Sequence, residues 1–295
     1  MDIKVTSKDL PGLYQSADSA SLKEQKKYFS GIAFYLILLI IAAFFAFFSA
    51  NNINPTSKIV STLFFLTTLS ILIWLRVSKP DDIWYNGRAV AESVKTRAWR
   101  WMLRAEPYED CEDVETMRKK FIGDLKSILK QNTSLIGELG IGSTVEEPIT
   151  KLMIEIRNLN LNDRLEIYRK ERITNQALWY TKKAKFNKKK SNLWFWVTVA
   201  LHFLAIVLLL YNIKEPQYKL PIEIIAVAAS SVLTWLQANK HNELSSSYSL
   251  TAHEIMLIKS ESSRISNESK LSEYIMNCEN AFSREHTQWV ARKSE

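Results

Sequence analysis

The chain has 295 residues and a formal net charge of +8, and 47% of its residues are hydrophobic. This length allows two domains of modest size. Gly and Pro are scarce, at 7 each, which disfavours a turn-rich β fold and indicates a mostly helical chain. The two cysteines lie far apart, so they match neither a metal-binding pattern nor a disulfide framework. Much of the positive charge flanks apolar stretches, which points to a membrane surface and to no nucleic-acid partner.

Four apolar stretches interrupt the charged sequence, and each has the length of a membrane-spanning helix. A helix crosses a hydrocarbon layer of ~30 Å with about 20 mostly apolar residues, and a backbone in lipid must satisfy its own hydrogen bonds. We therefore predict four transmembrane helices, with a buried core helix as the alternative for each stretch. The stretch at 220–238 is the least apolar because it contains Glu223. The predicted spans are residues 31–50, 59–77, 193–211 and 220–238.

Basic residues around these stretches predict the topology. They gather before the first span, after the second and before the third, where residues 182–190 contain six lysines. The loops at 51–58 and 212–219 are too short to fold as domains. Because segments rich in Lys and Arg stay in the cytoplasm, we expect a multi-pass protein with both termini cytoplasmic. The lysine cluster is expected to anchor this topology, and recognition of anionic lipid headgroups is the alternative.

The two hairpins are copies of one unit. A shift of 161 residues aligns Ser70 with Ser231, Pro55 with Pro216 and Lys27 with Lys188, without a gap. A repeat at this distance indicates a tandem duplication. Both copies enter the membrane from the same side, which weakens a transporter interpretation because secondary transporters often use inverted repeats. We predict a first unit at 20–132, a linker at 133–160 and a second unit at 161–295.

The charged segments carry apolar residues at helical spacing. The stripe Val90, Val94 and Ala98 follows the second span, and further helices are predicted at 112–131, 161–179, 243–259 and 269–292. Such stripes on charged helices are typical of helices that pack on other helices, within a chain or between subunits. The predicted fold is an all-α membrane protein with two tandem transmembrane helical hairpins and cytoplasmic helical extensions. The stripes of the second and last predicted helices are Val114, Met117, Phe121, Leu125 and Ile128, and Leu271, Ile275, Cys278, Phe282 and Trp289.

The sequence contains no motif of a known catalytic site. Phosphate-binding glycine loops, HExxH pairs and GxSxG elbows are all missing, and the four histidines are scattered. We therefore expect no enzyme activity, no catalytic residues, no cofactor and no metal site.

Several polar residues lie inside the predicted spans. Glu223, Ser230 and Thr234 share one side of the fourth span, and Ser231 lies beside them. Small and hydroxyl residues allow close helix packing, and the alternative is that this side lines a water-filled path. His202 in the third span marks a functional position by the same argument, and an interhelical hydrogen bond is its simpler interpretation.

A second group of candidate residues follows each hairpin. Glu92 and Glu254 lie one residue apart in the repeat register, roughly fifteen residues beyond their spans, and Arg88 and His253 lie nearby. Salt bridges between cytoplasmic helices are one interpretation. A ring of charges at the cytoplasmic mouth of an ion path is the other.

Residues 84–96, WYNGRAVAESVKT, followed by Trp99 and Arg100, resemble the segment after the hairpin in SLATT domains, a family of two-transmembrane bacterial effectors. The second half is similar to a sister SLATT subfamily at residues 184–190, in WLQA at 235–238 and in YSLTAHE at 248–254. The resemblance covers most of the chain apart from about the first 20 residues and the linker.

This resemblance implies a pore-forming effector of bacterial conflict and antiphage systems. Such an effector permeabilises the inner membrane when a partner sensor, often a nucleotide-signal module, is triggered. The expected partners are the lipid bilayer, further copies in a homo-oligomer and a nucleotide-signal sensor protein. One alternative is a membrane-anchored scaffold that recruits cytosolic partners through its helical extensions, and another is a small transporter or membrane enzyme.

Overall fold

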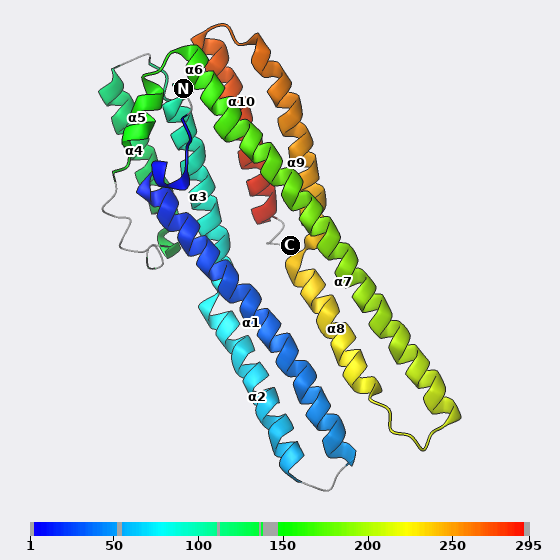
Figure 1. Cartoon of the computed structure of the whole chain (residues 1–295). Helices are drawn as coiled ribbons and strands as arrows, with labels where there is room; N and C mark the ends of the chain where they lie inside the picture. Colours follow the sequence, from blue (N-terminus) through cyan, green and yellow to red (C-terminus); the bar gives the residue numbers. More distant parts are fainter. Residues whose placement is uncertain (1–2, 52–54, 111–112, 136, 138–146, 292–295) are drawn as a thin grey trace. The chain divides into compact units, whose positions relative to one another are not determined.

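The computed structural model describes residues 3–51, 55–110, 113–135, 137 and 147–291, and these form helices without a β-strand (Figure 1). The chain divides into two compact units. The hairpin unit comprises Lys26–Pro80 and Ala184–Ser246. The charged unit comprises Met1–Gln25, Asp81–Lys183 and Ser247–Glu295. Each unit therefore combines segments from both halves of the sequence.

Four helices lie wholly or partly in the hairpin unit, and each is long and apolar enough to span a membrane. At most 17% of each apolar stretch is buried, which excludes the alternative of buried core helices. Large apolar side chains such as Phe34 and Phe203 are exposed instead, as expected for surfaces that face lipid. The predicted all-α fold with four spans is confirmed. The four helices are α1 (Gly12–Asn51), α2 (Pro55–Ser78), α7 (Asn175–Lys214) and α8 (Ile222–Asn239).

Helices α1 and α2 pack closely because small residues lie between them. A Cβ atom at Gly31 would approach the Leu75 Cδ2 atom to 3.0 Å, so a larger residue would have to displace the Leu75 side chain. Farther along the hairpin, the Ser61 hydroxyl donates a hydrogen bond of 3.1 Å to the carbonyl oxygen of Ala42. Small residues and interhelical hydrogen bonds of this kind hold membrane helices together where burial from water contributes little.

Both hairpins end at a lysine in the left-handed conformation. Lys79 has a φ of 43° and Lys240 a φ of 48°, and the two are 161 residues apart, which is the repeat distance. The backbone N–H of each donates to the carbonyl of a repeat-equivalent leucine, Leu75 or Leu236. Pro80 follows this interruption in the first copy, but the second copy has the same interruption without a proline. A left-handed C-cap is the shared feature, which the sequence pattern alone did not reveal.

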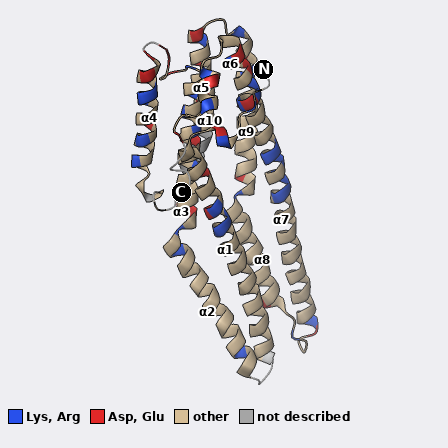
Figure 2. Ribbon diagram, turned by 60° about the vertical axis from the view of Figure 1, so that its left-hand side comes forward, with Lys and Arg blue, Asp and Glu red and all other residues tan. Residues whose placement is uncertain are grey.

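The helices of the charged unit enclose one hydrophobic core. Val90, Val94 and Ala98 are buried in it, as are Phe121, Leu125 and Ile128 of the predicted α4 stripe and the predicted α10 stripe as far as Phe282. Met117 is also buried, whereas Val114 is exposed at the start of α4, so its place in the buried stripe was wrong. The side chain of Trp289 lies outside the described residues. Figure 2 shows acidic and basic residues along these helices, whereas α2 and α8 carry few. The remaining helices are α3 (Pro80–Met102), α4 (Val114–Gln131), α5 (Lys151–Arg157), α6 (Leu161–Ile167), α9 (His241–Glu261) and α10 (Glu268–Ala291), with short turns η1 (Ser7–Asp9), η2 (Thr133–Leu135) and η5 (Ser262–Arg264).

Two segments differ from the simple helices that the periodicity predicts. The segment at 161–179 is not one α-helix, because a π-helical turn, η4 (Tyr168–Thr174), lies between α6 and α7. This turn buries Tyr168, Arg172 and Ile173, and the wider π geometry turns all three towards the core. Part of the predicted linker at 133–160 forms α5, where Met153 and Ile156 are buried; the boundaries of the two repeats stay a prediction.

A first prediction follows from the left-handed lysines. A residue with a Cβ atom in this conformation costs about 1–2 kcal/mol relative to the right-handed one, and glycine avoids this cost. We expect Lys79→Gly and Lys240→Gly each to raise the free energy of unfolding by about 1 kcal/mol, measured by denaturant titration in detergent. Lys58→Gly, on the first turn of α2, is the control and should lower it. A loss of stability in both C-cap variants would contradict the assigned conformation.

Candidate functional site

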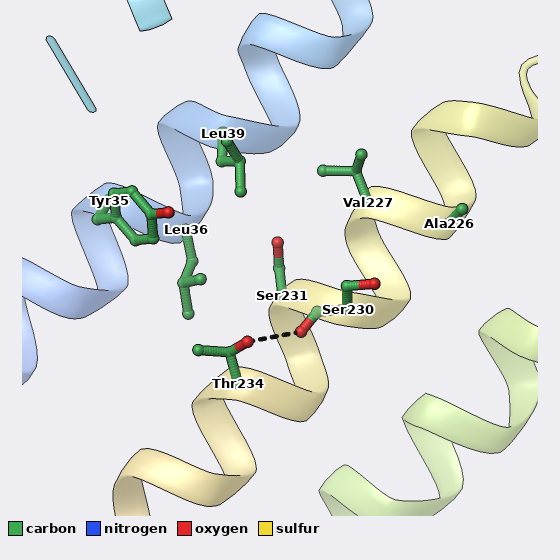
Figure 3. Close-up of a pocket in the computed structure, with 8 residues that line it drawn as sticks. All are labelled: Tyr35, Leu36, Leu39, Ala226, Val227, Ser230, Ser231 and Thr234. Atoms are coloured by element: carbon green, nitrogen blue, oxygen red, sulfur yellow. Dashed lines mark hydrogen bonds between the residues drawn. The ribbon is translucent and has the colours of Figure 1, made fainter. Parts of the chain in front are cut away.

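Helices α1 and α8 border a cavity of about 290 Å³ in the hairpin unit, which is open on the side of the exposed residues Ala226, Ser230 and Thr234 (Figure 3). Small side chains on α8 leave this space, because alanine and serine occupy positions where leucine would fill it. Three of the predicted pore residues, Ser230, Ser231 and Thr234, line it together. The other lining residues are Tyr35, Leu36 and Leu39 of α1 and Ala226 and Val227 of α8.

Among the residues that line this cavity, Ser231 has a buried hydroxyl group without a hydrogen-bond partner. Ser231 is only 4% exposed, and its Oγ atom has no hydrogen-bond partner among the described residues. Thr234 differs, since its Oγ1 atom donates to the carbonyl oxygen of Ser230 at 2.9 Å. Figure 3 shows Ser231 between the two helices, on the side of α8 that faces Leu36 and Leu39. A buried hydroxyl requires a partner, and a water molecule in the cavity would supply one.

The other two predicted pore residues lie away from this cavity. Glu223 is exposed in the first turn of α8, and His202 is exposed on α7. The Nδ1 atom of His202 lies 2.8 Å from the carbonyl oxygen of Thr198 in its own helix. Neither residue lines the cavity, so any function of theirs stays a prediction.

The candidate mouth residues lie in the charged unit. On α3, Arg88 forms ion pairs with Glu92 at 2.8 Å and with Asp18 of α1 at 3.3 Å. Glu92 raises the pKa of Arg88 and outweighs the opposing effect of burial. On α9, His253 is exposed and Glu254 is half-buried. The ion pair agrees with the simpler interpretation of Arg88 and Glu92, and an entrance role for the four residues stays a prediction.

The sequence pattern did not identify a buried ion pair between Arg172 on η4 and Glu279 on α10. Glu279 has no exposed surface and Arg172 has 1%. The Arg172 Nε and Nη2 atoms donate to the two carboxylate oxygens of Glu279 at 2.9 and 2.7 Å. The hydroxyls of Tyr168 and Thr96 donate to the same oxygens at 2.9 and 3.0 Å. The carboxylate therefore accepts four hydrogen bonds, which join η4, α10 and α3.

A signal for this pair was present in the sequence. Glu279 follows Ile275 by four residues and precedes Phe282 by three, so it falls on the apolar face of its helix. Arg172 likewise lies between the buried residues Tyr168 and Ile173. One opposite charge on each of two apolar faces predicts a buried pair, because a lone buried charge is too costly.

Burial and charge shift the pKa values of groups around this pair. Burial lowers the pKa of Arg172, but Glu279 outweighs that effect and raises it overall. Burial also lowers the pKa of Lys95, opposed by the charge of Glu92. The pKa of the Cys278 thiol rises to about 12, first through burial and then through Glu279. Glu279 therefore favours the ionised form of Arg172 and the neutral form of the Cys278 thiol.

Two further buried arginines hold the end of α3. Arg157 of α5 donates to the carbonyl oxygen of Trp101 and pairs with Asp110, and its guanidinium lies 4.8 Å from the Trp101 ring centroid. Arg164 of α6 donates to the carbonyl of Leu103 at 2.8 Å. The last carbonyls of a helix have no partner within the helix, so these guanidinium groups cap α3.

No cluster of three or more His, Cys, Asp or Glu side chains in the described ranges could hold a metal ion.

The buried pair leads to a prediction about stability. Glu279→Gln leaves Arg172 charged without a counter-ion, and breaking a buried ion pair typically costs about 3–5 kcal/mol. We expect a loss of this size in the free energy of unfolding, measured by denaturant titration of the detergent-solubilised chain. Glu273→Gln is the matched control, because Glu273 is exposed on the same helix. Equal effects of the two variants would show that the pair contributes little.

A related prediction concerns the Cys278 thiol. The thiolate is the reactive form, and a pKa of about 12 leaves the buried thiol neutral at about pH 8. In a Cys111→Ser background we expect maleimide labelling of Cys278 to be slow in the native chain and rapid after denaturation, measured by mass spectrometry. Rapid labelling of the native chain would contradict the buried position.

Two family models match this chain in tandem. SMODS and SLOG-associating 2TM effector domain 3 matches residues 11–165, which is more than half of the chain, and SMODS and SLOG-associating 2TM effector domain 1 matches residues 168–289. The comparisons found no match among curated proteins or solved structures. The two matches confirm the resemblance of both halves to SLATT domains, and they agree with a multi-pass membrane protein whose four spans come from two hairpins. The chain therefore belongs to the SLATT family of SMODS- and SLOG-associating two-transmembrane effectors and carries two such domains in tandem.

Proposed function

We propose that this chain is a membrane-permeabilising effector of a bacterial conflict or antiphage defence system. In this proposal it resides in the inner membrane with both termini in the cytoplasm, and a partner sensor triggers it. The family description supports an effector role, and the four spans support action at the membrane. The basic residues that flank the spans support the orientation.

The observation that carries the proposal is the cavity between α1 and α8. A hydroxyl group in the middle of a membrane helix is stabilised where it forms a hydrogen bond with another polar group or with water. Here the Ser231 hydroxyl is buried without a hydrogen-bond partner beside Ser230 and Thr234, so a water molecule in the cavity would supply the missing hydrogen bond. Its two walls come from different repeats, and a small displacement of one hairpin from the other would widen it.

An open pore requires more than one copy of this chain. Four helices are too few to enclose a wide aqueous channel, whereas hairpins from several copies can form a ring around an axis. We therefore include a homo-oligomer in the proposal. Because the family description names association with SMODS and SLOG, we assign the trigger to a nucleotide-signal sensor protein that contacts the charged unit.

A specific observation favours a second function, a membrane-anchored scaffold for cytosolic partners. The charged unit exposes large apolar side chains, among them Leu178 of α7 and Leu250 of α9. Exposed apolar residues on an otherwise charged body are suited to binding other proteins. A scaffold requires this surface and tolerates changes in the membrane cavity, so the two functions make different predictions.

The test is the membrane potential of bacterial cells during induced expression, followed with a potential-sensitive dye. We expect the wild-type chain to depolarise the cells and Ser230→Leu to slow depolarisation several-fold, because the leucine fills the cavity and removes a hydroxyl. Thr67→Leu is the matched control: Thr67 is exposed on α2 and its hydroxyl bonds only within its own helix, to Leu63. We expect this variant to behave like the wild type.

Two outcomes would contradict the proposal. Equal depolarisation by Ser230→Leu and the wild type, at matched amounts in the membrane, would exclude a role for the cavity. An intact potential with abundant wild-type chain in the membrane would favour the scaffold. Pull-down of cytosolic proteins by the wild type and not by an α9 variant would then be the next measurement.

A further inference from the structure

Helix α7 carries no acidic residue over its whole length. Its segment at 184–192 belongs to the hairpin unit and directly precedes the apolar stretch of the third span. One side of this segment is buried. Asn187 is 5% exposed, and its Oδ1 atom lies 2.8 Å from the Nδ1 atom of His241. The Ser245 hydroxyl donates to the carbonyl oxygen of Ala184 at 3.1 Å, so this side packs on the first turns of α9.

The opposite side of the segment presents three exposed lysines, Lys185, Lys188 and Lys189. They are spaced by three and four residues from the first, so they are neighbours on the helix surface. No ion pair joins any of the three to another residue in the described part of the chain. Like charges at this spacing destabilise a helix. The cluster therefore lowers the stability of α7 unless an anion from another molecule lies among the ammonium groups.

The lysine cluster lies on the side of α7 that faces lipid. Leu193 follows Lys189 by four residues and Trp196 follows it by seven, so both continue the same line along the helix. Leu193 is 52% exposed and Trp196 66%, as expected for side chains in contact with acyl chains. Phe186 is exposed next to the lysines, and aromatic side chains are enriched where a membrane meets water. The exposed side thus changes from basic to apolar where the span begins.

The height of the cluster matches the headgroup layer of a bilayer. A helix rises about 1.5 Å per residue, so Lys189 lies about 6 Å and Lys185 about 12 Å before the first residue of the span. The headgroup layer is about 5–7 Å thick on each side of a ~30 Å hydrocarbon core. Long lysine side chains extend towards such a layer, and their charge acts over a Debye length of about 8–10 Å. All three ammonium groups therefore lie within range of lipid phosphates.

A comparison of the two repeats separates lipid binding from the orientation of the hairpin. Residues 182–190 contain six lysines and no acidic residue, whereas their repeat equivalents, residues 21–29, contain three lysines and Glu24. In the predicted topology both hairpins enter the membrane from the same side, so the smaller charge of the first copy suffices for orientation. The additional charge of the second copy includes Lys185, at the position of Glu24 in the repeat. This excess indicates a role beyond topology.

We propose that Lys185, Lys188 and Lys189 form a binding site for the phosphate groups of anionic phospholipids around this end of the third span. The lipid phosphate supplies the anion that the cluster lacks, through charge-assisted hydrogen bonds from the ammonium groups. The acyl chains of the same lipid lie along Leu193 and Trp196. A second copy of this chain does not fit this side, because its own lysines would bring like charges together. The site requires that α7 spans the membrane, and it does not depend on the proposed pore.

The test titrates the detergent-solubilised full-length chain with phosphatidylglycerol and measures bound lipid by native mass spectrometry. We expect the triple variant Lys185→Gln, Lys188→Gln, Lys189→Gln to raise the dissociation constant of phosphatidylglycerol at least about tenfold. Phosphatidylcholine, which carries a phosphate but no net charge, should bind more weakly to the wild type and equally to both chains. Added salt should weaken the binding of phosphatidylglycerol to the wild type, because it screens the exposed charges.

The matched control removes the same charge from a helix that is not continuous with a span. Lys119→Gln, Lys120→Gln and Lys126→Gln remove three exposed lysines of α4, and this variant should bind phosphatidylglycerol like the wild type. The glutamine variant of α7 should keep the thermal stability of the wild type in lipid-free detergent, because its three lysines are exposed and form no ion pair among the described residues. A loss of lipid binding is then not a loss of the fold.

A charge-conserving variant, Lys185→Arg, Lys188→Arg, Lys189→Arg, should keep the affinity of the wild type for phosphatidylglycerol. Equal affinity of the wild type for phosphatidylglycerol and phosphatidylcholine would overturn the proposal without any variant. An equal loss of binding in the α4 control would also overturn it, because net charge would then explain the result. Displacement of phosphatidylglycerol by an equal concentration of inorganic phosphate or of a short RNA would overturn the lipid as the ligand and indicate a soluble anion.

Discussion

The buried ion pair of Arg172 and Glu279 joins three helical segments of the charged unit. Removing both charges from water is costly, and the cost is offset by the attraction between the charges and by their hydrogen bonds. The Nη1 atom of Arg172 is buried without a hydrogen-bond partner among the described residues, and the guanidinium lies 4.7 Å from the Phe282 ring centroid. Here Tyr168 and Thr96 complete the hydrogen bonds of Glu279. The pair therefore joins η4, α10 and α3, and Arg172 itself is buried within the π-helical turn η4.

The boundary between the two repeats differs from the boundaries of the two compact units. The two family matches divide the chain near residue 166, between 11–165 and 168–289. The compact units instead combine parts of both repeats, and the Arg172–Glu279 network joins α3 of the first repeat to η4 and α10 of the second. The equivalent left-handed lysines show that the copies keep the same local geometry where each hairpin ends. Duplication thus preserved the hairpins, while the charged helices merged into one core.

Two features remain exposed or unsatisfied after the cores are formed. In the hairpin unit, the serines of α8 border a cavity in which the Ser231 hydroxyl is buried without a hydrogen-bond partner among the described residues. In the charged unit, α9 exposes Leu250 and Leu257. In the proposed function, the cavity accounts for passage through the membrane.

Residues close together in the chain suffice to predict the spans, the repeat, the family and the buried stripes of α3, α4 and α10. Hydropathy over some twenty residues selects a span, and helical periodicity selects the side that is buried. Three further features emerge only once the helices are packed: Arg172 meets Glu279, Ser231 faces α1 without a partner, and Leu257 points away from the core. These features depend on contacts between segments that are distant in the sequence. Helical periodicity predicts which side of a helix is buried, but it does not predict which other helix packs against that side.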